Sequence, residues 1–339
     1  MSTPIMGTPR NPDIESVRVA VTLACRAPSV HNSQPWRWHY TNGRLELSGD
    51  RSRVLPMMDP SGRQLVISCG AALDHLRVAF TALKWSTRID RLPEGLHSET
   101  LATIGFGRDA RPASHDFDLL SSIRRRYSDR RPFGPAAEIE RVVAAAVAPP
   151  HVQVTTVPQD GRAVLAAATE LSAASRRYDT AYQDELHWWT GHSTTTSGIP
   201  REALIPADLR RRVDVGRLFP AGSKGAADTP MPDADRSTVL VISTDTDERP
   251  DWLAAGETLS ALLLAATVEG LATCPLTHVT ELKSSRNMIA HLLPEEGYPQ
   301  ALIRIGKVES EGRPQATPRL PTDAVLSVDP RTPGKSRLP

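Results

Sequence analysis

One pattern of small and apolar residues occurs twice in this chain of 339 residues. The residues Gly70, Leu73, Leu76, Ala79 and Thr81 return at the same spacing as Gly256, Leu259, Leu262, Ala265 and Thr267, each 186 positions later. Steps of three residues between apolar positions are typical of one face of a helix. Because a pattern repeated at a fixed offset indicates a duplicated unit, we expect two related halves, each with a long apolar helix.

A second correspondence supports the duplication, which matters because glycine, alanine and leucine are common enough to match by chance. Ala27-Pro28 follows one predicted helix, and Ala148-Pro149 follows another. The distance from the proline to the repeated glycine is 42 residues in the first half and 107 in the second. The second half therefore carries about 65 extra residues, which we place within residues 158–236.

This insert has the composition of a lid or cap. It contains the pair Trp188-Trp189, a polar run over Thr194 to Gly198, and a stretch rich in glycine and proline over Phe219 to Pro232. The two tryptophans have two open interpretations. They stack on a bound molecule, or they anchor the insert to the rest of the protein.

The overall composition excludes several classes of protein. Forty basic and 39 acidic residues give a net charge of +1, which argues against nucleic acid or an anionic membrane as the main partner. The three cysteines, Cys25, Cys69 and Cys274, lie far apart and form no metal or disulfide pattern. We identify no targeting signal and no transmembrane segment, so the cytoplasm is the expected location.

The periodicity of the chain predicts a mixture of helices and strands without a regular βαβ alternation. Helices are expected from Asn11 or Asp13 to Cys25, from Asp59-Pro60 to Leu83, and near 117–127, 136–147 and 254–271. Strands are expected over 36–40, 45–48, 100–106, 152–157, 239–243 and 301–305. Asn42-Gly43 predicts a tight turn between the first two strands, because both residues tolerate positive φ.

The stretch Ala27–Trp36 reads A-P-S-V-H-N-S-Q-P-W and joins a predicted helix to a predicted strand. Its polar residues fit turn capping, and Trp36 and Trp38 fit the core. The stretch also resembles the segment A-P-S-x-x-N-x-Q-P-W, by which flavoproteins of the nitroreductase superfamily hold the isoalloxazine ring of FMN. The resemblance implies that the cofactor contacts Pro28, Ser29, Val30, Asn32 and Gln34. Asn32 can both donate and accept at the amide-like edge of the ring.

A cluster of arginines follows about a hundred residues later, in the sequence R-R-R-Y-S-D-R-R-P-F at 124–133. Such a run is ordinarily a solvated helix end that suits the helix dipole. Guanidinium groups also bind phosphate through paired, charge-assisted hydrogen bonds. The spacing resembles the R-x-S-x-R clamp of nitroreductases, and R-R-P-F resembles its Acg-type variant. The resemblance places Arg126, Ser128 and Arg130 on the FMN phosphate.

The two halves keep different parts of this site. The first half has the ring-binding stretch, but no arginine clamp occurs 22 residues before Ala27, within Met1 to Thr8. The second half has the clamp 22 residues before Ala148, but Ala148 to Gln153 lacks the serine, the asparagine and Q-P-W. Two subunits of a homodimer would form two sites. The fused chain is expected to form one site, to bind one FMN, and to act as a monomer that is an internal dimer.

Further resemblance concerns the end of the chain. It places Thr277 and His278 beside the N5 edge of the flavin, chiefly through their backbone. His278 is a candidate proton donor, with a capping or surface histidine as the alternative. Arg319, in Pro318-Arg319-Leu320-Pro321, resembles the last phosphate-binding arginine of the family, and 335–339 (K-S-R-L-P) is a second candidate for that segment.

The sequence thus predicts an α+β, nitroreductase-like fold of two fused repeats, with antiparallel sheets flanked by helices. The first half spans residues 1–112, and the second spans 113–339 with the insert at 158–236. The resemblance implies that NAD(P)H reduces FMN, which then passes two electrons to a nitroaromatic or quinone, without a catalytic side chain or a metal.

Two alternatives stay open at this point. In the first, the insert closes over FMN, and the protein stores or sequesters the cofactor, which suits the stress responses associated with Acg-type proteins. In the second, the protein is a flavin-degrading or dehalogenating reductase of the same superfamily.

Overall fold

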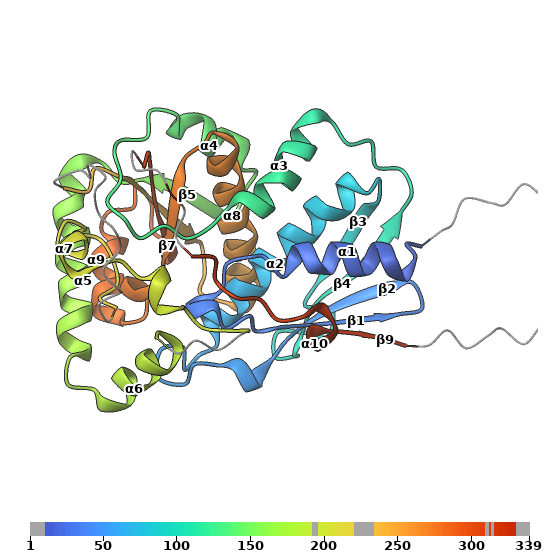
Figure 1. Ribbon diagram of the computed structural model, residues 1–339, viewed down its shortest axis with the longest axis horizontal. Coiled ribbons are helices and arrows are strands. Elements are labelled where there is room, and N and C mark those ends of the chain that lie inside the picture. Colours follow the sequence, from blue (N-terminus) through green and yellow to red (C-terminus); the bar gives the residue numbers. More distant parts are fainter. Residues whose placement is uncertain (1–10, 192–195, 220–233, 309–311, 313–314, 330–339) are drawn as a thin grey trace, which may run out of the picture.

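Two sheets, whose strands are mostly antiparallel, lie on either side of a central pair of long helices (Figure 1). The computed structural model describes residues 11–191, 196–219, 234–308, 312 and 315–329. The central helices are α2, Arg63–Ala82, and α8, Arg249–Val268, and they carry the two copies of the repeated pattern. The resulting fold is an α+β arrangement, as the sequence predicts.

The two central helices cross where the repeated glycines meet. A Cβ atom on Gly70 would lie 2.1 Å from the carbonyl oxygen of Leu253, and one on Gly256 would lie 2.0 Å from that of Ile67. Each glycine therefore allows the backbone of the opposite helix to approach closely. The equivalence of the two contacts agrees with the shared offset of 186 residues.

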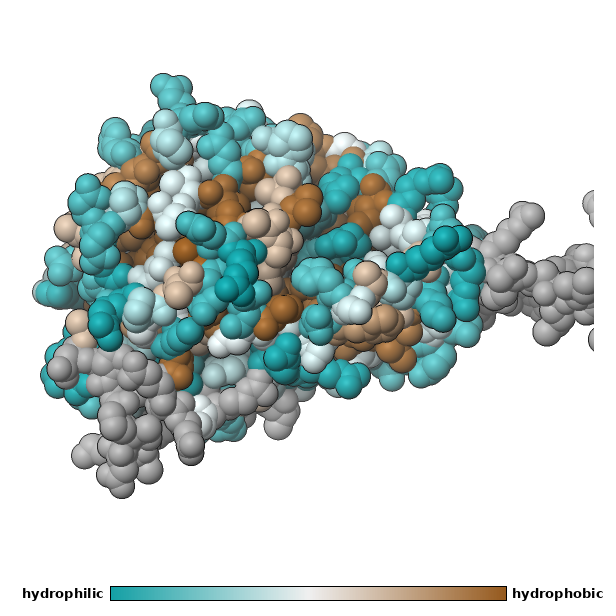
Figure 2. Space-filling view, turned by 90° about the horizontal axis from the view of Figure 1, so that it is seen from above, coloured by the Kyte–Doolittle hydropathy of each residue, from teal (hydrophilic) through white to brown (hydrophobic). Residues whose placement is uncertain are grey.

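By length and composition, the same two helices are long and apolar enough to cross a membrane, although no transmembrane segment is expected from the sequence. In the most apolar window of each helix, 83% of α2 and 72% of α8 is buried inside the protein. The face shown in Figure 2 carries hydrophobic residues interspersed with hydrophilic ones. The apolar character of the two helices is therefore explained by their place between two cores.

The first sheet has the strand order β3-β4-β2-β1-β9. The strands are β1, Trp36–Thr41; β2, Arg44–Gly49; β3, Ser86–Arg91; β4, Thr100–Gly107; and β9, Leu326–Val328. Asn42 and Gly43 form the β1–β2 turn with φ values of 49° and 77°, as expected for this dipeptide. β9 comes from the end of the chain and pairs in parallel with β1, so a distant segment completes the sheet of the first half.

The second sheet has the order β5-β6-β8-β7, and all its neighbours are antiparallel. The strands are β5, Val152–Thr156; β6, Thr238–Thr244; β7, Ala272–Leu276; and β8, Tyr298–Gly306. The helices outside the insert are α1, Ile14–Ala24; α3, Ser114–Arg125; α4, Ile139–Ala145; α9, Lys283–Ala290; and α10, Thr322–Val325. The predicted helices and strands are all present, whereas β3, β7, β9, α9 and α10 were missed.

The insert at 158–236 forms helices that pack against both halves (Figure 1). These are α5, Arg162–Arg176; α6, Thr180–Trp189; and α7, Ala207–Arg210. α5 packs against α9, whereas Tyr182 and Leu186 of α6 pack against Leu55 and Met58 of the first half. Residues 192–195 and 220–233 of the insert lie outside the described residues.

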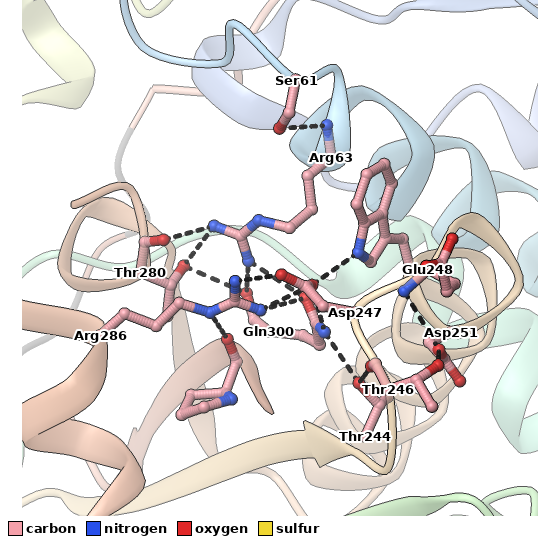
Figure 3. A network of polar contacts seen from close by, with 12 residues as sticks. Ser61, Arg63, Thr244, Thr246, Asp247, Glu248, Asp251, Thr280, Arg286 and Gln300 are labelled. Atoms are coloured by element: carbon pink, nitrogen blue, oxygen red, sulfur yellow. Dashed lines mark hydrogen bonds and ion pairs between the residues drawn. The ribbon is translucent and has the colours of Figure 1, made fainter. Parts of the chain in front are cut away.

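A buried polar network fastens α2 to the second half (Figure 3). Arg63, at the start of α2, donates to the backbone carbonyls of Thr280 at 2.6 Å and Gln300 at 3.1 Å. Arg286 and Gln300 both bind Asp247, whose carboxylate balances the two guanidinium groups. Burial and the charge of Arg286 lower the pKa of Arg63 to about 10, so it stays charged at neutral pH.

We predict that Gly70→Ala destabilises the protein by about 3 kcal/mol or more, because the new methyl group forces the two helices apart. In an exposed helix the same change would stabilise the protein by about 1 kcal/mol. Urea unfolding of the wild type and of Gly70→Ala measures the loss of stability. Gly105→Ala is the control, because a Cβ on Gly105 meets no atom within 4 Å. Equal stability of the Gly70 variant and the wild type would contradict the close crossing.

Candidate functional site

The ring-binding stretch forms an irregular turn between α1 and β1. His31, Asn32 and Gln34 have φ values of 47°, 57° and 52°. These values lie in the left-handed region, which residues other than glycine and asparagine rarely adopt. The hydroxyl of Ser29 accepts from the backbone N–H of Gln34 at 3.0 Å, and the hydroxyl of Ser68 accepts from the backbone N–H of Val30 at 3.2 Å. Strain of this kind, at about 1–3 kcal/mol per residue, is characteristic of functional sites.

This turn lines a cavity between the two halves. Ten of the eleven residues that the sequence singled out line it: Pro28, Ser29, Val30, Asn32, Arg126, Ser128, Arg130, Thr277, His278 and Arg319. Gln64, Ile67 and Ser68 of α2 and Leu259 of α8 form the wall near the helix crossing. Segments separated by up to about 290 residues in the chain therefore meet at one place.

One end of the cavity is a cluster of three arginines. Arg126 donates to the backbone carbonyl of Arg26 at 2.9 Å, and Arg319 donates to the same carbonyl at 3.3 Å. Burial, followed by the charges of Arg319 and Arg26, lowers the pKa of Arg126 to about 9. Burial and the charge of Arg26 lower the pKa of Arg319 to about 10. Both side chains therefore remain cations at neutral pH, close to other cations.

The cluster still has hydrogen-bonding capacity. Among the described residues, Nε and Nη1 of Arg126 and Nε of Arg319 are buried without a hydrogen-bond partner. An unsatisfied buried charged group is costly, so these atoms require an explanation. An anion with several oxygen atoms satisfies both the charge and the free N–H groups.

Arg130 corrects the expectation that the whole R-x-S-x-R segment points at one group. Its charged neighbours are Asp129 and Arg217, together with the Cys274 thiol, and not the Arg126 cluster. Its guanidinium lies 5.1 Å from the centre of the Phe219 ring. Arg126, Ser128 and Arg130 all line the cavity, but Arg130 lies beside Phe219 and Arg217 rather than in the arginine cluster.

The amide side chains of the turn hold other segments in place. Asn32 donates to the carbonyls of Gly198 at 3.0 Å and Pro318 at 2.9 Å, and accepts from Arg319 at 2.7 Å. Gln34 does not line the cavity. It is fully buried and binds the Thr196 carbonyl and the Leu320 amide.

These bonds change the expected role of Asn32. Both hydrogens of its amide are donated within the protein, so the side chain positions Arg319 and the insert. The expectation that it offers a free donor and acceptor to the flavin edge does not fit this arrangement.

The segment after β7 forms the wall opposite the turn. Thr277 donates to the side-chain oxygen of Gln64 at 2.6 Å, and the His278 carbonyl accepts from Ser172 at 3.1 Å. The side chain of His278 is 3% exposed, which excludes a surface histidine. Burial and the charge of Arg217 hold its pKa well below the ordinary value, so the imidazole is neutral at neutral pH.

The insert contributes residues that sequence reasoning missed. Ile199, Ala203, Arg217 and Phe219 line the cavity, and Arg217 forms a buried ion pair with Glu281. Arg26, His31 and Gln64 were also missed. Only His31 carried a signal, because it lies inside the ring-binding stretch. The candidate Lys335–Pro339 segment lies outside the described residues, whereas Arg319 lines the cavity.

The opposite half carries different residues at the positions equivalent to three residues of the cavity wall. The residues 186 positions after Ile67 and Ser68 are Leu253 and Ala254, which are fully or almost fully buried in the cores. The residue 186 positions before Thr277 is Arg91, which binds Glu257 of α8 through two hydrogen bonds of 3.0 and 2.8 Å. At these positions the opposite half therefore has two core residues and an ion-paired arginine instead of Ile67, Ser68 and Thr277.

Comparisons with known proteins agree with this architecture. The chain is 43% identical over 320 residues to the Mycobacterium tuberculosis protein named "Putative NAD(P)H nitroreductase acg", which covers 92% of this chain and 95% of that protein. It is 36% identical over 300 residues to a second mycobacterial protein with an NAD(P)H nitroreductase name, covering 87% and 86% of the two chains.

A crystal structure described as "a putative nitroreductase" from Anabaena variabilis shares the fold, with a TM-score of 0.52, 8% identity, and coverage of 90% of this chain and 93% of that one. No protein-family model matches the chain. The chain belongs to the nitroreductase superfamily, and within it to the Acg type.

We predict that Arg126→Met raises the stability of the protein without added ligand by about 1 kcal/mol or more, because it removes a buried charge from a cluster of like charges. The gain should shrink as the pH rises through about 9, because the folded wild type then loses the proton from Arg126 while the unfolded chain keeps it.

Arg304→Met is the matched control. Arg304 is also buried but is paired with Asp235, so its removal should cost about 3 kcal/mol or more. Thermal unfolding at pH 7 and pH 10 measures both variants. A large loss of stability in Arg126→Met would contradict the excess of positive charge.

Proposed function

We propose that the cavity binds FMN, with the phosphate among Arg26, Arg126, Ser128 and Arg319 and the isoalloxazine ring toward Arg130 and Phe219. The observation that carries this proposal is the buried arginine cluster with unpartnered N–H groups at one end of a cavity between the halves. A phosphate dianion supplies the missing charge and acceptors. Elsewhere the cavity is lined by both apolar and polar residues, which suits a flat ring with polar edges.

The proposed activity is the two-electron reduction of a nitroaromatic or quinone at the expense of NAD(P)H. The flavin supplies the hydride chemistry when it is bound. The residues of this chain bind and orient it: the arginines hold the phosphate, Asn32 and Gln34 hold the surrounding segments, and the strained turn fixes the ring end. The names of the mycobacterial relatives include NAD(P)H nitroreductase, which supports this reductant and this class of acceptor.

A second candidate function is the storage or sequestration of FMN, with the insert as a lid. The observation behind it is the set of contacts between the insert and the cavity. Gly198 and Thr196 bind Asn32 and Gln34, and Phe219 lies beside the ring end. A cover held by these bonds would limit the access of NAD(P)H to the ring.

The stoichiometry follows from the same geometry. The second half lacks the ring-binding residues. Leu253, Ala254 and Arg91 stand at the positions equivalent to Ile67, Ser68 and Thr277 of the cavity wall, so we propose one FMN per chain. The two halves that meet around the cavity, residues 1–112 and 113–339, would act as the two subunits of a homodimer. On this proposal the protein is a monomer of the cytoplasm that acts as an internal dimer.

We predict that the purified protein is yellow or takes up added FMN, and that NADPH bleaches the visible flavin spectrum under anaerobic conditions. A colourless protein that takes up no FMN would contradict the cofactor. Bleaching by dithionite but not by NADPH would replace the reductase by the storage function.

The same spectra test the phosphate end of the site. Arg126→Met and Asn32→Ala should each weaken FMN retention about tenfold or more, because they remove a phosphate contact and the anchor of Arg319. Arg124→Met is the control, because Arg124 belongs to the same arginine run but is exposed. FMN retention that depends equally on Arg124 and Arg126 would contradict the clamp.

A further inference from the structure

Two buried histidines from opposite halves line the end of the cavity away from the arginine cluster. His31 belongs to the strained turn and is 6% exposed, and His278 follows β7 and is 3% exposed. Among the described residues, none of their four ring nitrogens has a hydrogen-bond partner. The charged neighbours of His31 are Arg217 and Arg130, which places the pair at the ring end.

A third buried histidine shows what a structural role looks like in this chain. His75 is fully buried in α2, and its Nδ1 lies 2.8 Å from the hydroxyl of Ser260 on α8. One of its ring nitrogens is thus used to join the central helices. Among the described residues, His31 and His278 make no such bond, although both line the cavity.

The chemistry of the pair defines what it can bind. Burial and nearby cations hold both pKa values well below the ordinary value, so each imidazole is neutral and has one N–H donor and one acceptor nitrogen. A neutral pair of this kind complements a ring edge on which carbonyl oxygens and N–H groups alternate. The edge of Phe219 lies against His31, with ring centres 5.7 Å apart and planes at 82°, and adds an apolar wall.

We propose that the side chains of His31 and His278 hydrogen-bond the alternating carbonyl and N–H edge of a planar heteroaromatic ring, and so select the ring that the cavity accepts. The proposal rests on the proposed function, in which this ring is the isoalloxazine of FMN. It assigns to the two imidazoles the polar recognition that Asn32 cannot supply, because both hydrogens of its amide are donated within the protein.

The test compares FMN with riboflavin, which has the same ring but no phosphate. After removal of bound flavin, fluorescence quenching gives the affinity of the wild type, His31→Phe and His278→Phe for both compounds. Each variant should bind both compounds about tenfold more weakly, by the same factor, and should shift the absorption maximum of the bound flavin. Arg126→Met should weaken FMN far more than riboflavin.

Two further variants separate recognition from folding. His278→Gln keeps one donor and one acceptor and should recover part of the lost affinity, whereas His291→Phe, at an exposed position, should change neither affinity nor spectrum. Without flavin, the two phenylalanine variants should be at least as stable as the wild type, because they remove unsatisfied polar atoms.

The outcomes distinguish this proposal from the proposed function. A wild type that binds neither flavin contradicts the proposed function. A wild type that binds FMN with an affinity and a spectrum unchanged in both phenylalanine variants overturns the histidine proposal alone. A change confined to the KM for NADPH, with the flavin spectrum unchanged, would assign the pair to the reductant and overturn the proposal as well.

Discussion

The close crossing of α2 and α8 at Gly70 and Gly256 is the contact on which the site depends. Because neither residue has a Cβ, the backbones of the two helices are in direct contact, which holds the two halves close together. This proximity brings Ile67 and Ser68 of one half into the same cavity as Leu259 of the other. Wider spacing of the helices would separate the strained turn from the arginines.

Buried arginines in and near the site include some that are paired with a carboxylate and some that lie beside other cations. Arg304 and Arg217 are buried with carboxylate partners, Asp235 and Glu281, and hold the fold together. Arg126 and Arg319 are buried beside other cations, and their pKa values are lowered first by burial and then by that repulsion. Such a cluster destabilises the unliganded protein and is stabilised by an anion, which is the behaviour expected of a binding site rather than a structural one.

Much of this architecture could be predicted from the sequence, because it rests on local patterns. The duplicated helix, the Asn42-Gly43 turn and the buried Trp36 and Trp38 follow from periodicity and residue preference. β3 was missed because its sequence S-T-R-I-D-R is short, charged and largely exposed at the edge of a sheet. β7 was missed because glycine and proline in 270–275 suggest a loop, and β9 because only pairing with β1 defines it.

The candidate site was predicted in its members but not in their roles. Ten of the eleven residues named from the sequence line one cavity, yet the separation of Arg130 from Arg126 and the internal bonds of Asn32 depend on three-dimensional packing. Arg26 contributes its backbone carbonyl and its charge to the cluster, and Arg217 and Phe219 reach the cavity from the insert, so no linear motif could identify them.

The central claim is that two fused halves build one binding site between them. Native mass spectrometry of the protein saturated with FMN tests it most directly, because it reports the number of chains and of cofactors in the same particle. The account predicts a single chain of 36.9 kDa carrying one FMN. Two FMN molecules bound to one chain would contradict it.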